Sequence, residues 1–209
     1  MLTLTELKQT GPETFLARFD NGEELKTTLN VVTDYSLFAG KQLDDMEMDA
    51  LRSASSLSRC KQRALRIIGA RAMSVKELTD RLKEKGERPE DAEEAAQWLM
   101  EMHLLDDQQY AEMCVRHYAA KGYGPGRIRS ELYRRGIPKD LWEDALVSLP
   151  EQDDQIDRLL RRKLRGEHPD KNDLRKASDF LYRRGFQWEE IRAAIQRYQE
   201  EMEDSTDGL

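Results

Sequence analysis

The sequence has few of the residues that mark secreted, membrane-spanning or metal-binding proteins. Its 209 residues include two cysteines, Cys60 and Cys114, which are too few for a disulfide framework and typical of a reducing, cytoplasmic setting. It has no run of about 18 apolar residues, so we expect no membrane-spanning helix and no membrane partner. The first residues lack the basic start and apolar stretch of a secretory signal. The histidines and cysteines share no ligand spacing, which argues against a zinc site.

Catalytic motifs are missing as well. The chain has no Gly-x-Ser-x-Gly, Walker, dinucleotide-binding or His-Glu-x-x-His sequence, so we expect neither an enzyme nor a cofactor. The glycine-rich stretch 122–126 has Pro125 where a phosphate cradle needs a free amide, which favours a tight turn between helices. Asp106 and Asp107 are placed to cap a helix. Cys114 lies among apolar helical positions, which is typical of a small core residue.

Charge is what the sequence has in abundance. Charged residues make up 36% of the chain and apolar residues 38%, against about 25% and about 45–50% in average soluble domains. The formal net charge of -7 argues against simple electrostatic binding of nucleic acid. The charge is uneven, however, because residues 115–135 hold six basic residues and one acidic residue, Glu131. Screening acts over about 8–10 Å, so such a local excess decides what approaches that surface.

The first thirty residues have the pattern of β-strands. Residues 15–19 and 24–29 flank Asn21-Gly22, and this dipeptide between two such runs predicts a hairpin with a type I′ turn. Residues 2–7 alternate apolar and polar side chains and predict a third strand.

Two helices are expected after these strands. One covers 31–38, and a longer one covers 44–57 with Asp44 or Asp45 as its N-cap. Residues 1–58 are therefore predicted to form a small unit of β-hairpin, sheet and helix.

From residue 59 onward the pattern is helical and repeats. Leu132-Tyr133-Arg134-Arg135-Gly136 recurs as Leu181-Tyr182-Arg183-Arg184-Gly185, and Leu82-Lys83-Glu84-Lys85-Gly86 is a weaker copy. The glycines are 50 and 49 residues apart, and an alanine follows each glycine by nine positions. A helix is expected to end at each glycine, because glycine readily adopts the left-handed conformation that closes a helix. A further helix is predicted before each copy, at 60–69, 107–120 and 155–165.

These observations predict a mainly α fold of three tandem three-helix repeats. Because one such unit cannot bury its apolar face alone, the repeats should stack into an elongated array. The acidic end from Glu200 is expected to be disordered. The predicted segments after residues 1–58 are repeats at 59–105, 106–150 and 151–204, followed by a tail at 205–209.

Basic residues are the candidates for a binding surface. Arg127 and Arg134 are seven residues apart and share a helix face, with Lys121 in the turn before it. A further helical stripe has the spacing i, i+3, i+4 and i+7 and consists of Arg158, Arg161, Arg162 and Arg165. Such residues bind a polyanion or an acidic protein, or they form a solvated face and favourable helix ends; both interpretations stay open.

The motifs of the helical part resemble the RecX regulatory family over residues 59–200. The match follows order and spacing through Leu105-Asp106-Asp107, Tyr110-Ala111, Lys121-Gly122-Tyr123-Gly124-Pro125, Ile128, Glu131-Leu132 and Gly136-Ile137. The Asn-Gly hairpin is similar to the N-terminal extension of some members. The first repeat departs from the pattern, since it has Lys85 where the later copies have arginine and Glu87 where they have an apolar residue.

The resemblance implies a protein of the bacterial cytoplasm that binds the RecA recombinase filament on single-stranded DNA. We expect the protein to be a monomer. Members of the family modulate, and mostly inhibit, the ATPase, strand-exchange and co-protease activities of RecA in DNA repair. A helical-repeat DNA-binding module without a RecA role, or a scaffold for another protein, are the alternatives. The candidate contacts with RecA or DNA are Lys121, Arg127, Arg134, Arg135, Arg161, Arg162, Arg165, Arg183 and Arg184.

Overall fold

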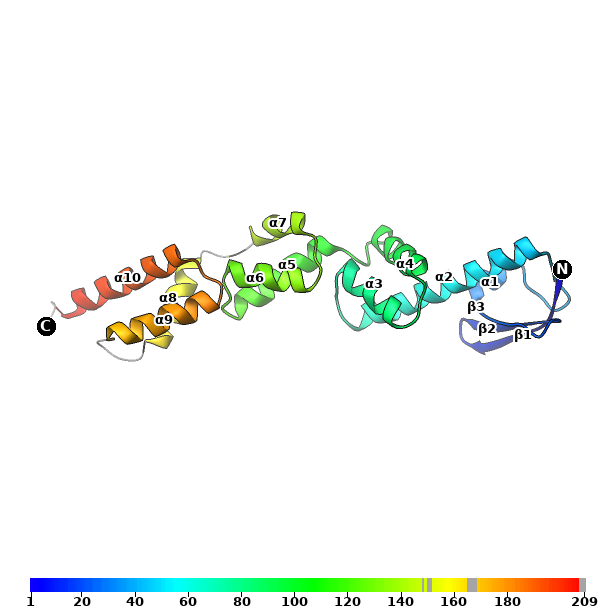
Figure 1. Ribbon diagram of the computed structural model, residues 1–209, viewed down its shortest axis with the longest axis horizontal. Helices are drawn as coiled ribbons and strands as arrows, with labels where there is room; N and C mark the ends of the chain where they lie inside the picture. Colours follow the sequence, from blue (N-terminus) through cyan, green and yellow to red (C-terminus); the bar gives the residue numbers. More distant parts are fainter. Residues whose placement is uncertain (148, 150–151, 165–168, 207–209) are drawn as a thin grey trace. The chain divides into compact units, whose positions relative to one another are not determined.

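The structure is a computed structural model that describes residues 1–147, 149, 152–164 and 169–206. The chain divides into two compact units, Met1–Asp106 and Asp107–Leu209. The first contains a small sheet and one three-helix domain, and the second contains two further three-helix domains (Figure 1). The predicted fold class is confirmed.

The first unit begins with an antiparallel sheet of strand order β3-β2-β1-β4. Its strands are β1 (Leu2–Gly11), β2 (Thr14–Phe19), β3 (Glu24–Thr28) and β4 (Gln42–Leu43). The alternating residues 2–7 do form a strand, as predicted. The short helix expected at 31–38 is α1 (Leu29–Asp34), which begins and ends earlier.

The hairpin between β2 and β3 does not have the predicted type I′ turn. Gly22 has φ +85°, but positive φ at described residues other than glycine occurs at Ser36 and His103, so Asn21 does not adopt it. The Phe19 amide donates to the Glu23 carbonyl at 2.9 Å, and the Gly22 amide donates to Phe19 at 3.0 Å. This is a three-residue loop, a type I turn followed by a left-handed glycine, which needs positive φ at the glycine alone.

One long helix, α2 (Asp45–Ala70), replaces the two helices predicted at 44–57 and 60–69. The expected break was wrong because no proline or glycine lies between Asp45 and Gly69 to interrupt the helix. Asp44 caps it through a reciprocal capping box with Glu47. Its first half packs against the sheet, and its second half lies in the core of the first three-helix domain.

Each three-helix domain has its own apolar core. The second half of α2 packs with α3 (Val75–Glu84) and α4 (Pro89–Glu101). The second domain contains α5 (Asp107–Ala120), α6 (Pro125–Arg134), the short 3-10 helix η1 (Lys139–Leu141) and α7 (Trp142–Leu146). The third contains α8 (Gln152–Lys163), α9 (Lys171–Arg183) and α10 (Trp188–Thr206). The acidic end is thus helical as far as Thr206, contrary to the disorder expected from Glu200; residues 207–209 lie outside the described residues.

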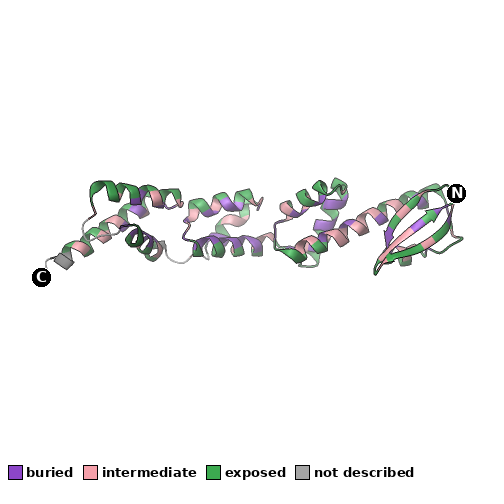
Figure 2. Cartoon of the chain, turned by 90° about the horizontal axis from the view of Figure 1, so that it is seen from below, coloured by how far each residue is buried: buried purple, intermediate pink, exposed green. Residues whose placement is uncertain are grey.

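The repeat deduced from the sequence is a repeat of buried positions. In all three domains the leucine four residues before the glycine and the alanine nine residues after it have no exposed surface; these residues are Leu82, Leu132, Leu181, Ala95, Ala145 and Ala194. The alternation of buried and exposed stripes along the helices can be followed in Figure 2. Each glycine has positive φ and ends its helix as predicted; the angles are +83° at Gly86, +67° at Gly136 and +90° at Gly185.

Candidate functional site

The glycine-rich turn between α5 and α6 joins the second domain to the third. The Gly124 amide donates to the Arg184 carbonyl at 2.8 Å, and the Gly126 amide donates to the Gly185 carbonyl at 3.0 Å. A Cβ atom at Gly124 would lie 2.7 Å from the Gly185 carbonyl, and one at Gly185 would lie 2.1 Å from the Arg127 nitrogen. The stretch is therefore a tight interhelical turn, as predicted, and its missing side chains also let two backbones meet.

Arg184 reinforces this junction with its side chain. Its guanidinium donates to the carbonyl oxygens of Lys121 at 2.8 Å and Gly122 at 3.0 Å. It also lies 5.6 Å from the ring centroid of Tyr123 and 4.7 Å from that of Phe180. Arg184 was predicted as an external contact, but these interactions direct its side chain to the adjoining domain.

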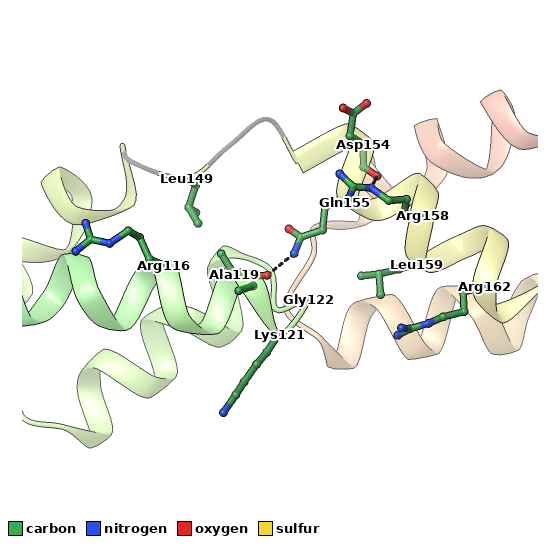
Figure 3. A pocket seen from close by; sticks show the side chains of 11 residues that line it. Arg116, Ala119, Lys121, Gly122, Leu149, Asp154, Gln155, Arg158, Leu159 and Arg162 are labelled. Carbon is green, nitrogen blue, oxygen red and sulfur yellow. Dashed lines mark hydrogen bonds between the residues drawn. The ribbon is translucent and has the colours of Figure 1, made fainter. Parts of the chain in front are cut away.

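A cleft of about 560 Å³ lies beside the junction, between α5 and α8 (Figure 3). Its α5 side carries Arg116 and the following Lys121, and its α8 side carries Arg158 and Arg162. Apolar surface between them comes from Ala119, Ala120 and Leu159. The Gln155 side chain crosses from α8 and donates to the Ala119 carbonyl at 2.6 Å, as the dashed line in Figure 3 shows.

The cleft carries an excess of positive charge. Among the described lining residues, Asp154 is the one carboxylate beside four cations. Arg162 makes no hydrogen bond or ion pair with the part of the chain that the structure describes. Arg116 lies 3.6 Å from Glu112 in an exposed pair, and such a pair holds its charge weakly. Low-dielectric walls lined by one sign of charge focus the field, so this cleft favours an anion.

Two other candidate residues are held by a buried carboxylate. Glu131 is 5% exposed and lies 3.2 Å from Arg127, and the Arg134 Nε atom donates to it at 3.1 Å. Burial raises the pKa of Glu131, but Arg134, Tyr118 and Arg127 lower it by a larger amount, so the pKa lies below its ordinary value. Glu131 therefore stays ionised and neutralises much of the helix face that the sequence predicted as a binding surface.

The remaining candidates separate into different environments. Arg135 donates to the hydroxyls of Tyr110 and Tyr118 within its own domain. Arg161 donates to Glu201 on α10, at 2.7 and 2.9 Å, and does not line the cleft. Arg183 is exposed and makes no hydrogen bond or ion pair with the described residues. Arg165 lies outside the described residues.

The structure therefore brings together Lys121 and Arg162 from the predicted set and adds Arg116 and Arg158. Arg158 and Arg162 are four residues apart and both belong to the predicted stripe, so their spacing already placed them on one helix face. In the sequence, Arg116 was indicated only by the excess of basic residues in 115–135. No periodicity could connect it with α8, because the two helices are brought together by contacts between domains that leave no pattern along either helix.

Two further features are missing from the described residues. In that part of the chain no helix is both long enough and apolar enough to cross a bilayer. Nor do those residues contain a group of three histidine, cysteine, aspartate or glutamate side chains placed to hold a metal ion.

Fold and cleft together define a tandem three-helix-domain protein with a cationic cleft between two of its domains. Family models for the first, second and third three-helix domains of RecX match residues 60–99, 106–146 and 151–195. The regulatory protein RecX of Cronobacter sakazakii is 34% identical over 166 residues, covering 72% of this chain and 99% of that protein. The chain therefore belongs to the RecX family of regulatory proteins.

Other relatives extend the similarity into the N-terminal sheet. The regulatory protein RecX of Bacillus subtilis is 26% identical and covers 99% of this chain and 80% of its own length. A crystal structure of RecX from Lactobacillus salivarius has a TM-score of 0.64 at 25% identity and covers 69% of this chain and 97% of that one. A second crystal structure, of a regulatory protein RecX, shares the fold over 94% of this chain and 100% of that one, with a TM-score of 0.77 at 21% identity.

Proposed function

We propose that this protein binds the RecA recombinase filament on single-stranded DNA and mostly inhibits its ATPase, strand-exchange and co-protease activities. It acts by binding, as a monomer in the bacterial cytoplasm, and catalyses no reaction of its own. Membership in the RecX family supports the recombinase as partner. The observation that carries the site is the cationic cleft between the second and third domains.

The cleft is suited to a polyanion because contacts within the protein hold its walls in place. Two backbone hydrogen bonds at the junction and the Gln155 bond to Ala119 fix α5 relative to α8. A preformed site loses little conformational entropy on binding, so more of the electrostatic attraction appears as affinity. DNA phosphates and acidic side chains on a filament both present closely spaced negative charge, which Arg158 and Arg162 on one helix face can meet.

The test is the DNA-dependent ATPase rate of RecA, measured with increasing amounts of wild type or of the variant Arg158→Glu plus Arg162→Glu. We expect the variant to need at least about tenfold more protein for half inhibition, because two attractive contacts become repulsive. The matched control, Lys176→Glu plus Arg192→Glu, changes the net charge equally at two exposed positions of the same domain outside the cleft lining. It should stay within about twofold of wild type.

Arg134 and Arg135 are less suitable targets for this test. Replacing them removes an ion pair of Glu131 and the hydrogen bonds to Tyr110 and Tyr118, so a loss of inhibition would also follow from unfolding.

Thermal unfolding of the cleft variant, Arg158→Glu plus Arg162→Glu, should match wild type. Equal inhibition by the cleft variant and the control would contradict the assignment of the cleft.

The cleft also supports a second function, DNA binding without a role at the recombinase. In that case the protein would bind naked single-stranded DNA with steep salt dependence while leaving RecA ATP hydrolysis unchanged. The ATPase measurement separates the two functions.

A further inference from the structure

The first unit contains a second cationic cavity, distinct from the cleft. It has a volume of about 420 Å³ and lies between the sheet and α2. Lys26 lines it from β3, and Arg59, Arg63 and Arg66 line it from α2. The spacing i, i+4 and i+7 places these three arginines on one face of the helix.

The walls of this cavity are held in place by side-chain contacts between β3 and α2. The Ser55 hydroxyl donates to the Thr27 hydroxyl at 2.9 Å, and the hydroxyls of Thr28 and Ser58 are 2.6 Å apart. Both threonines are buried. The cations are therefore presented by a strand and a helix that are joined to each other by these contacts.

Most of the cationic charge in the cavity is not neutralised. Arg63 is paired with Glu87 at 2.9 Å and donates to the Lys85 carbonyl. In contrast, Lys26 and Arg59 make no hydrogen bond or ion pair with the described residues, and the Nε atom of Arg66 bonds only a backbone carbonyl.

Apart from Glu87, which pairs with Arg63, the described carboxylates do not neutralise these cations. Among the described residues no carboxylate lines the cavity; the nearby Glu13 accepts a hydrogen bond from Gln62 at 3.3 Å. A cavity of this volume with net positive charge suits one phosphate group together with the chemical group that carries it.

An aromatic ring completes the lining. Phe15 on β2 borders the cavity with the aliphatic Leu16, so an apolar surface lies beside the cations. Proteins that bind single strands combine a cationic path for phosphates with aromatic rings on which bases stack. In a duplex the bases are stacked with one another and cannot reach such a ring. We propose that this cavity binds the backbone of single-stranded DNA, with one base against Phe15.

This contact is independent of the recombinase and of the cleft, so it is tested without RecA. The full chain is titrated into a fluorescein-labelled oligothymidylate, and anisotropy is measured over a salt series. Removing two phosphate contacts with Arg59→Gln plus Arg66→Gln should weaken binding about tenfold and reduce the slope of log K against log salt by about 1.4. Lys76→Gln plus Arg81→Gln, which removes the same charge from exposed positions of α3 outside the cavity, should change neither.

The same comparison is made in a chain that carries Arg158→Gln plus Arg162→Gln, where the loss at Arg59 and Arg66 should persist. Phe15→Leu should weaken the binding of oligothymidylate and leave the slope of log K against log salt unchanged, because it removes stacking and no charge. Affinity and slope equal to those of the Lys76 and Arg81 control would overturn the proposal, whatever the cleft does. Equally tight binding of duplex DNA, or full competition by a polyglutamate peptide at matched charge, would overturn it as well.

Discussion

The ends of α6 and α9 have the same five residues and use them differently. In both, the leucine has no exposed surface and the glycine has positive φ. The five residues therefore end the helix in the same way in both domains. The second arginine differs. Arg135 bonds two tyrosine hydroxyls of its own domain, whereas Arg184 bonds two carbonyl oxygens of the preceding domain. In these two copies the same five residues give the same helix end, whereas the role of the second arginine depends on neighbours that differ.

The residue before the leucine explains much of this difference. It is Glu131 in the second domain and Phe180 in the third. Glu131 holds Arg134, whereas Phe180 packs against Arg184 and leaves Arg183 without an ion pair among the described residues. One position therefore decides whether the first arginine is neutralised or exposed as a charge.

The largest expected effect tests the close approach at the α9 end. Gly185→Ala should weaken docking of the third domain by about 3 kcal/mol, because strain at positive φ adds to overlap with Arg127. Amide exchange at Gly124 and Gly126, which donate across the junction, should speed up about 100-fold. Gly86→Ala is the matched control, because Gly86 has φ +83° but nothing lies within 4 Å of the new Cβ. It should lower the free energy of unfolding of its own domain by only about 1 kcal/mol. Similar effects of both changes would show that the junction does not depend on close approach.

Replacing the second arginine should have different effects at the end of α6 and at the end of α9. Arg184→Ala removes two hydrogen bonds to backbone carbonyls and should weaken docking by about 2 kcal/mol, which is roughly a 30-fold faster exchange at Gly124 and Gly126. Arg135→Ala should destabilise the second domain by a similar amount in urea unfolding and leave junction exchange unchanged. Faster junction exchange in the Arg135 variant would mean that the two arginines share one role.

The smallest expected effect concerns the carboxylate that only the second domain has at this position. Because the folded-state pKa of Glu131 is lowered, its ionisation stabilises the fold above its unfolded pKa of about 4.3, and this stability is lost as pH falls through the folded-state pKa. Glu131→Gln should cost about 1.5 kcal/mol at pH 7 and flatten the dependence of the urea midpoint between pH 5 and pH 3. Glu143→Gln, at an exposed pair with Arg129, should flatten it less. A pH profile unchanged by Glu131→Gln would contradict the ion-pair assignment.

Much of the fold was predictable because backbone and core requirements leave local signals. Glycines that end helices, leucines at fixed distances before them and capping residues such as Ser74 specify where helices begin, end and pack. The predicted break in α2 failed for a physical reason: a change of amino-acid composition near residue 58 does not interrupt a helix. The type I′ turn failed because Asn-Gly also suits the three-residue loop.

The cationic cleft was only half predictable. Arg158 and Arg162 could be paired from their spacing on one helix, but their meeting with Arg116 and Lys121 depends on backbone hydrogen bonds between domains. Glu131 lies only three residues from Arg134 and was visible in the sequence. That it is buried and binds two arginines required the packing of α5 against α6.

The unbroken helix α2 has a consequence for how the first unit is divided. A cut between residues 58 and 59 would sever hydrogen-bonded turns in the middle of a helix and deprive the latter half of its Asp44 cap. The sheet and the first three-helix domain thus share one cooperative element. Strain applied at either end of that helix is carried directly into the core at the other.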